Sequence, residues 1–555
     1  MRFPQFLTAV LFAASFVAAP ALALAQDDAA KPAAADKGAA EKTSAEKAAA
    51  EKAQPAESTT QGTVDVGGGH IAYTAVAGTI TVGSTDVQDA QLGIDGRPQP
   101  GSQLANAEPK DPKDATPYAR IFYVAYFKKD AKAEDRPITF FYNGGPGSST
   151  VWLHMGSLGP KHVVTSTDQH LPAAPYKMID NAYSLLDASD LVFIDMPGTG
   201  FGRLVGKDAE KAFWGVDEDA NAFARFIQRF VTKFNRWNSP KYLFGESYGT
   251  TRSAVLANIL ENGKSMDLNG VILLSQIFNF TTDIDGPQGN PGVDLPYVLG
   301  LPTYAATAWY HKKLPTQRAE LEPFLKEVEE FAMGPYTHAL GQGTDLTAEE
   351  KQSVAAKLHD YTGLPVAYLL KANLRVNGGE FEKTLQEDQD LTTGRLDTRF
   401  SGPNLNPLSE GAEYDPQSSA ISSAYVSLFN DYVRRDLKYG EGQTYLPHAQ
   451  FGSTEWDVVH KGNPIDLNVA NDLAEALKTN PRLRVMVNGG YYDLATPFFA
   501  AEYEEKHLPI PQSLAKNIEY DWYESGHMVY VRDESLKQLH DRVAAFIKST
   551  LADSK

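Results

Sequence analysis

Short apolar segments recur along the chain, and stretches with helical periodicity separate them. Apolar runs of this length without alternation are typical of strands that are buried on both faces of a parallel sheet. Residues 217–234 place Phe223, Phe226 and Phe230 on one helical face, with Asp217 as the expected N-cap. The alternation of strands and helices therefore indicates an α/β sheet. The apolar segments are residues 138–142, 191–194, 242–244, 271–274, 483–487 and 518–522.

Two parts of the chain depart from this rhythm. Residues 69–83 and 119–128 are rich in β-formers and predict antiparallel hairpin strands before the parallel sheet. Residues 285–425 hold helical stretches instead, with a capping box at Thr347 and Glu350. We interpret 285–425 as an inserted helical cap, either a lid over a site or an incidental insertion. The helices expected there are residues 316–333, 347–361 and 365–374.

The N-terminal region is typical of an export signal followed by a tether. Residues 1–25 combine Arg2, an apolar run and an Ala-x-Ala site ending at Ala25, which predicts a cleaved signal peptide. A membrane anchor is the alternative, but Pro20 interrupts the run. Residues 26–62 repeat Ala-Glu-Lys and predict a linker. No later stretch of about 18 uncharged apolar residues exists, so we expect a periplasmic or secreted protein, without a membrane segment, whose core is residues 63–284 and 426–555.

Composition excludes several classes of chemistry. The 555 residues include no cysteine, which rules out disulfides, thiolate zinc sites, iron–sulfur clusters and a cysteine nucleophile. The formal net charge of -19 argues against nucleic acid as a partner, because proteins that bind phosphate backbones have basic patches. The sequence contains no H-E-x-x-H motif and no calcium-binding loop, and we predict neither a metal site nor a cofactor.

One motif points to nucleophilic catalysis. Gly245-Glu246-Ser247-Tyr248-Gly249 follows the apolar segment 242–244 and precedes a helix-forming stretch. A strand, a sharp turn and a helix are the setting of a nucleophile elbow, in which the central serine stands exposed at the helix N-terminus. The alternative is a tight turn without chemistry. The context favours Ser247 as a nucleophile.

A serine nucleophile needs a base, and the base needs an acid that orients it. Asp493 follows the segment 483–487, and His527 follows the segment 518–522, so both come after predicted strands. Asp521 is a rival acid but lies within a strand. His540 lies in a predicted helix, residues 534–550, and is expected at the surface. The order Ser247, Asp493, His527 is the chain order of nucleophile, acid and base in α/β-hydrolases.

Four blocks of sequence stand out. They are Asn143-Gly144-Gly145-Pro146-Gly147-Ser148-Ser149, Asp195-Met196-Pro197-Gly198-Thr199-Gly200-Phe201, the elbow, and the pair Gly490-Tyr491-Tyr492-Asp493 and Gly526-His527-Met528-Val529. Together these blocks resemble the serine carboxypeptidase family, in its bacterial secreted branch. The resemblance covers about residues 130–545, and the blocks occur in the family's order. It implies an α/β-hydrolase fold with a mainly parallel sheet, N-terminal antiparallel hairpins and an inserted helical cap.

The resemblance also implies roles for individual residues. Ser247 is the expected nucleophile, His527 the general base and then acid, and Asp493 the carboxylate that orients it. The backbone N–H groups of Gly145 and Tyr248 would form the oxyanion hole, in agreement with the rule that the residue after the nucleophile supplies one donor.

A second implied site binds the substrate's C-terminal carboxylate through Asn143, the Gly144 backbone and Glu246. A carboxylate beside a bound carboxylate is repulsive, so Glu246 would have to be protonated. Family members usually place a second Glu where this chain has Ser157. A lone Glu is expected to titrate near its ordinary pKa of about 4.3. Ser148 stands where relatives carry a disulfide cysteine.

The sequence therefore predicts a secreted serine-type carboxypeptidase that acts on peptide substrates and, by resemblance, could form a homodimer. An esterase, an acyltransferase or an aminopeptidase on the same scaffold is the main alternative. A binding protein that retains the fold without activity is the third possibility, and the intact set Ser247, Asp493 and His527 argues against it.

Overall fold

The computed structural model describes residues 57–93, 96–103, 115–452 and 455–552. The predicted signal peptide and residues 26–56 of the predicted linker lie outside these ranges. Residues 57–62, which the sequence assigned to the linker, form the start of strand β1 (Glu57–Val66). β1 is an edge strand with largely polar, partly exposed residues, so its composition resembles that of a tether although its backbone pairs with β2.

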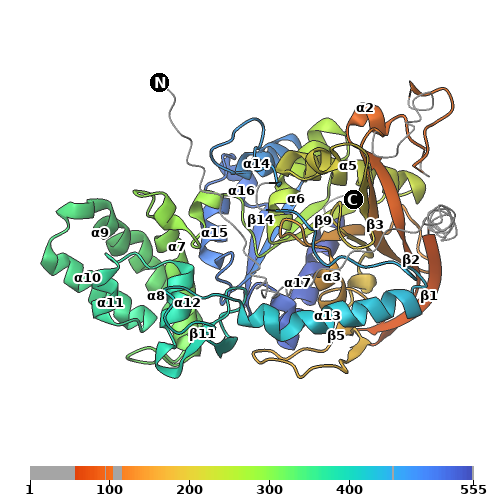
Figure 1. The fold of residues 1–555 in the computed structure, drawn as a ribbon. Helices are drawn as coiled ribbons and strands as arrows, with labels where there is room; N and C mark the ends of the chain where they lie inside the picture. Colours follow the sequence, from red (N-terminus) through yellow and green to blue (C-terminus); the bar gives the residue numbers. More distant parts are fainter. Residues whose placement is uncertain (1–56, 94–95, 104–114, 453–454, 553–555) are drawn as a thin grey trace, which may run out of the picture.

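A large mixed sheet forms the centre of the molecule (Figure 1). Its strand order is β1-β2-β3-β7-β4-β9-β10-β13-β14, and the short β8 pairs with β3. Pairings from β1 to β7 are antiparallel, and pairings from β7 to β14 are parallel. These strands confirm the predicted hairpins and the predicted parallel segments. Their bounds are β2 Gly69–Gly83, β3 Tyr118–Lys128, β4 Ile138–Tyr142, β7 Asp190–Ile194, β8 Arg203–Val205, β9 Lys241–Glu246, β10 Gly270–Leu274, β13 Arg484–Gly490 and β14 Ile518–Tyr523.

Helices cover both faces of the sheet, because the central strands are apolar on both sides. Phe141, Phe193 and Phe244 point into one apolar cluster, while Phe140 and Leu243 point into the other. The first cluster packs under α3 (Val151–Gly156), α13 (Pro416–Arg435) and α17 (Asp533–Ala552). The second packs under α5 (Val216–Lys233), α6 (Tyr248–Asn258) and α14 (Ala470–Thr479). This arrangement confirms the α/β-hydrolase fold.

The predicted N-cap of α5 is wrong. The cap residue is Gly215, and Asp217 lies in the first turn of the helix. The Asp217 carboxylate instead accepts bonds from the His460 ring and the Lys461 N–H, which belong to a loop more than two hundred residues away. No local sequence pattern predicts a partner this far away in the chain.

The cap helices gather at one side of the molecule and have their own apolar cluster (Figure 1). They are α7 Leu295–Tyr310, α8 Leu321–Phe331, α9 Thr337–Gln342, α10 Ala348–Thr362, α11 Val366–Lys371 and α12 Gly378–Thr384. The predicted capping box at Thr347 and Glu350 is present. Helix α13 begins inside the segment predicted as cap, but it packs against α3 on the core.

The remaining short elements connect these layers: α2 Asp86–Asp89, β5 Lys161–Val163, β6 Met178–Asp180, α4 Ala209–Phe213, β11 Leu391–Thr393, β12 Ser401–Pro403, α15 Phe498–Lys506 and α16 Gln512–Ala515. Helix α15 packs against α7, so the cap touches the element that follows Asp493. Among the described residues, we find no helix with the length and apolar character needed to span a lipid bilayer.

Candidate active site

Ser247 occupies the sharp turn between β9 and α6. Its backbone angles, φ 61° and ψ −133°, lie in a region that non-glycine residues seldom adopt, as expected for the strained turn of a nucleophile elbow. A side chain on Gly245 would overlap the Gly249 carbonyl, which explains the glycine two residues before the serine. The Ser247 N–H donates to the Leu274 carbonyl at 3.0 Å, and its side chain is half-buried.

Asp493 and His527 come together at the carboxyl ends of β13 and β14. The His527 Nδ1 atom lies 2.8 Å from Asp493 Oδ2, and both side chains are buried. Burial lowers the pKa of His527, but the Asp493 carboxylate more than compensates, so that the net pKa of His527 is raised above its ordinary value. Asp493 thus holds the imidazole in one orientation and stabilises its cationic form.

The backbone links the Ser247 elbow to the loop of His527. Ser275, the residue after Leu274, donates its hydroxyl to the His527 carbonyl at 2.8 Å. The Ser247 elbow and the His527 loop are therefore linked through one segment at the end of β10. No hydrogen bond of standard geometry joins the Ser247 hydroxyl to the His527 ring in the part of the chain that the structure describes. Such bonds are often long in unliganded enzymes and shorten when substrate binds.

Thr496 is a member of this site that the sequence analysis missed. Its N–H donates to Asp493 Oδ1 at 3.0 Å, and its hydroxyl donates to Asp493 Oδ2 at 2.7 Å. The hydroxyl also lies 3.2 Å from His527 Nδ1. A Thr three residues after a catalytic acid is the pattern of a side chain that bonds back across a turn, and this spacing was the available signal.

The rival residues have other partners. Asp521 lies within β14 and pairs with Arg542 at 3.1 Å. His540 lies in α17 between Asp187 and Asp541. Its side chain is buried, which contradicts the expected surface position. The reason is that α17 turns this face towards the 3-10 turn that carries Asp187, and the ion pair compensates for burial of the ring.

The Gly-rich loop after β4 lies against the elbow. A side chain on Gly144 would overlap the backbone nitrogens of Tyr248 and Gly249, so only glycine permits this close approach. Within the described ranges, neither the Gly145 N–H nor the Tyr248 N–H donates a hydrogen bond. Two free N–H groups on adjacent loops beside a serine have the composition of an oxyanion hole.

Asn143 and Glu246 form the second part of the site. The Asn143 amide donates to Glu246 Oε1 at 2.8 Å, while its own oxygen accepts the Leu153 N–H at 3.0 Å. The Asn143 carbonyl accepts from Arg252, whose guanidinium is fully buried against Asp219. These bonds fix Asn143 in one orientation.

Glu246 has an unusual protonation state for a carboxyl group. Burial raises the pKa of Glu246 to about 7, against the opposing effects of the His527 charge, Tyr530 and Asn143. The expectation that a lone Glu titrates near 4.3 is therefore wrong, because it neglected burial. Ser157 does not substitute for a second acid, since its hydroxyl donates to the Leu153 carbonyl at 2.6 Å.

A segment of the cap contacts the loops that carry Asp493 and His527. Residues 394–400 join β11 to β12 and pass directly beside Asp493 and His527. The His527 N–H donates to the Leu396 carbonyl at 2.6 Å, and the Leu494 N–H donates to the Arg395 carbonyl at 3.1 Å. Sequence analysis missed this segment, whose bends and turns carry no strand or helix pattern.

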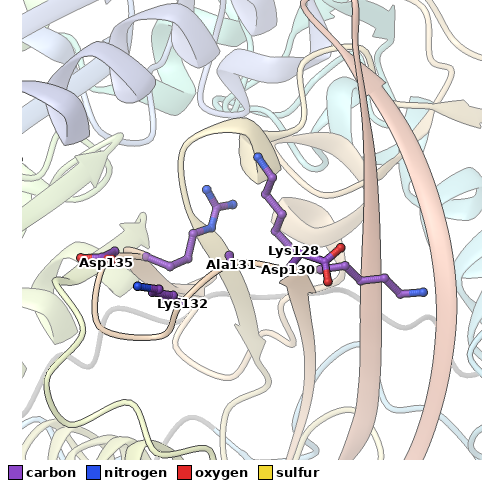
Figure 2. Close-up of a pocket in the computed structure, with 7 residues that line it drawn as sticks. Lys128, Asp130, Ala131, Lys132 and Asp135 are labelled. Carbon is purple, nitrogen blue, oxygen red and sulfur yellow. The ribbon is translucent and has the colours of Figure 1, made fainter.

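The hollow in Figure 2 lies elsewhere. It is lined by Lys128, Asp130, Lys132 and Arg136 and their neighbours, on the turn between β3 and β4. This turn precedes β4, so the hollow is at the amino end of that strand, whereas Gly144 and Gly145 follow the carboxyl end. The hollow is therefore not part of the site around Ser247.

Comparison with protein families gives one decisive match. The family model described as serine carboxypeptidase matches residues 113–548, which is most of the chain. The chain belongs to the serine carboxypeptidase family. This confirms the resemblance found in the sequence, while assignment to a bacterial branch stays a prediction.

Individual relatives match over shorter stretches. The chain is 28% identical over 255 residues to the pheromone-processing carboxypeptidase KEX1 of Cryptococcus gattii, covering 43% of this chain and 35% of the relative. It is 30% identical over 133 residues to a serine carboxypeptidase-like protein of Oryza sativa subsp. japonica, covering 23% of this chain and 28% of the relative. The matches thus span about a third of these relatives' length.

Among solved structures, the chain matches the proline iminopeptidase of Mycobacterium smegmatis with a TM-score of 0.34 and an identity of 14%, over 79% of this chain and 97% of that chain.

Proposed function

We propose that this protein is a secreted serine-type carboxypeptidase that removes C-terminal residues from peptides through an acyl-enzyme on Ser247. Membership of the family supports the reaction class. The observation that carries the proposal is the buried Asn143–Glu246 pair beside the elbow. A hydrolase of simple esters has no need of such a pair, whereas a carboxypeptidase needs donors for a terminal carboxylate.

In the proposed mechanism Ser247 Oγ attacks the scissile carbonyl carbon, and the hydroxyl proton passes to His527. The carbonyl oxygen becomes an oxyanion that accepts from the Gly145 and Tyr248 N–H groups. Collapse of this intermediate breaks the C–N bond, and the leaving amino acid takes the proton from His527. Water then attacks the acyl-enzyme with His527 as base, which releases the shortened peptide and restores Ser247.

The terminal carboxylate would be held by Asn143, the Gly144 backbone and a protonated Glu246. As the pH rises through about 7, Glu246 ionises and repels the substrate carboxylate, so KM for peptides should rise. As the pH falls, His527, whose pKa is raised, becomes protonated and cannot act as base. The rate of peptide hydrolysis should therefore have a bell-shaped dependence on pH, and its two limbs reflect the interacting groups Glu246 and His527 together.

The test is mass spectrometry of N-terminally blocked peptides after digestion between pH 4 and 8. We expect stepwise loss of C-terminal residues and little cleavage of the matched C-terminal amides. An ester without a free carboxylate should lack the alkaline limb, and Glu246→Gln should remove that limb for peptides. Identical pH dependence of KM for peptide and ester would refute the role of Glu246.

The same digestion separates the alternatives. Release of N-terminal residues from unblocked peptides would indicate an aminopeptidase. Hydrolysis of esters alone, or transfer to an added alcohol, would indicate an esterase or an acyltransferase. Ser247→Ala should abolish labelling by a fluorophosphonate probe in all three cases.

Export is part of the proposal. The signal-like pattern of residues 1–25 supports it, and the N-terminus of the mature protein, determined by mass spectrometry, tests it. The homodimer implied by the family resemblance is tested by light scattering of the purified protein.

A further inference from the structure

Three buried polar atoms near Asn143 have no hydrogen bond of standard geometry among the described residues. They are Glu246 Oε2 and the hydroxyls of Tyr425 and Tyr530. Buried polar groups are nearly always paired, so unpaired atoms in one region call for an explanation. Glu246 is the only acid among the three, and both phenols act on it electrostatically.

Tyr530 reaches this region from the turn that follows His527. It belongs to the 3-10 turn Val529–Val531, and its side chain is fully buried. A side chain on Gly156 of α3 would begin 2.7 Å from Tyr530 Cε2 and 2.6 Å from the Tyr425 hydroxyl. The absence of a side chain at Gly156 therefore leaves the space that the two tyrosines occupy.

The surroundings of the two tyrosines differ. The Tyr530 hydroxyl interacts with both Asn143 and Glu246, the two groups that we propose to hold the substrate carboxylate. The Tyr425 hydroxyl, on α13, interacts with Thr165 and only at longer range with Glu246. The two phenols are thus a matched pair with different neighbours.

We propose that Tyr530 is a positioning residue for Glu246, and that its hydroxyl donates to Glu246 Oε2 while the Asn143 amide donates to Oε1. The carboxyl group is then held at both oxygens, with its acidic proton directed to the substrate. This inference rests on the proposed function, because it assigns a purpose to Glu246.

The charges around Glu246 give the direction of the effect. Burial and the charge of Asp493 raise the pKa of Glu246. The charge of His527 and hydrogen bonds from Tyr530 and Asn143 lower it. The pKa of Tyr530 is well above its usual value, so the phenol stays neutral and acts as a donor. A donor to a carboxylate favours the ionised form, so removal of this hydroxyl should raise the pKa of Glu246 further.

The experiment compares pH profiles of KM for a blocked dipeptide and for an ester that lacks a carboxylate. In Tyr530→Phe the alkaline limb of the peptide profile should move up by about one pH unit, the usual effect of one hydrogen bond to an ionised group. The ester profile and its kcat should stay within about twofold of wild type, since among the described residues the Tyr530 hydroxyl forms no hydrogen bond to Ser247, Asp493 or His527.

Tyr425→Phe is the matched control, because it removes the same atom from the neighbouring ring. It should leave the peptide limb unmoved. A limb that does not move in Tyr530→Phe, or that moves equally in Tyr425→Phe, overturns the inference while the proposed function stands. Absence of the limb in the wild type, with Glu246→Gln having no effect, refutes the proposed role of Glu246, whereas failure to release C-terminal residues from blocked peptides refutes the proposed function itself.

A second measurement observes the tyrosine ring itself. In protein labelled with 3-fluorotyrosine, the ¹⁹F signal that is missing from labelled Tyr530→Phe belongs to Tyr530, and it should titrate with Glu246 near pH 7. This titration should vanish in Glu246→Gln. If the Tyr530 signal does not follow Glu246, the proposed contact is wrong.

Discussion

Asp397→Asn tests whether the cap segment 394–400 positions the catalytic loops. Asp397 accepts from Arg399 Nε at 2.9 Å and from Arg399 Nη2 at 2.6 Å, and the two side chains are only 1% and 4% exposed. Arg399 also donates to Ser525 Oγ at 3.2 Å, two residues before His527. The substitution keeps the shape of the side chain and removes its charge.

The magnitude follows from the burial of this ion pair. Removing one partner of a buried pair leaves an uncompensated charge and typically lowers stability by ~3–5 kcal/mol. Because the Leu396 carbonyl accepts the His527 N–H, a displaced segment would also shift the imidazole. A misplacement of about 1 Å at a catalytic group lowers the rate by about 10²-fold. We therefore expect both a lower melting temperature and a kcat reduced on the order of 10²-fold.

The assay is ester hydrolysis, with kcat and KM measured well below the melting temperature of the variant. Asp294→Asn is the matched control, because Asp294 forms a similar two-bond pair with Arg375 in the cap, and among the described residues no hydrogen bond links that pair to the loops of Asp493 and His527. The control should lose stability and keep its kcat. Wild-type kcat in folded Asp397→Asn, or an equal loss of kcat in the control, would refute the positioning role of the segment.

Three further outcomes are expected. Thr496→Val removes a charge-assisted bond to Asp493, and kcat should fall about 10–100-fold with KM unchanged. Gly144→Ala would drive a methyl group into the Tyr248 nitrogen, and kcat should fall by about 10²–10³ for peptide and ester alike, as after loss of an oxyanion donor. Burial raises the pKa values of Asp195 and Glu504 to about 7, so the folded state retains protons that the unfolded chain releases near pH 4. The stability contributed by these groups is complete below about pH 4 and is lost as the pH rises to about 7, so melting temperature should decline over this range, and less steeply in Glu504→Gln.

Much of the sheet could be predicted from the sequence because its information is local. Segment 138–142 coincides with β4, and the predicted helix 217–234 differs from α5 by one residue at each end. Uninterrupted apolar runs require burial on both faces, and phenylalanines at helical spacing require one buried face. The elbow at Ser247 was recognisable for a similar reason, since its glycines, its strand and its helix are adjacent in the chain.

Predictions from the sequence were wrong where a residue's partner is distant in the chain or where its burial depends on tertiary packing. Asp217 was expected to cap α5, but it pairs with a loop near residue 460. His540 was expected at the surface, but packing of α17 buries it beside Asp187.

The sequence by itself determined the α/β-hydrolase scaffold and the family, because strand and helix propensity and the motifs within each block depend on residues close together in the chain, and it supplied Ser247, Asp493 and His527 as the proposed catalytic residues. Only the tertiary structure decided the state of the groups around them. Glu246 retains its proton to about pH 7 because the fold removes it from water. Likewise, the support of His527 by Leu396 depends on a cap segment more than a hundred residues away, brought close only by folding.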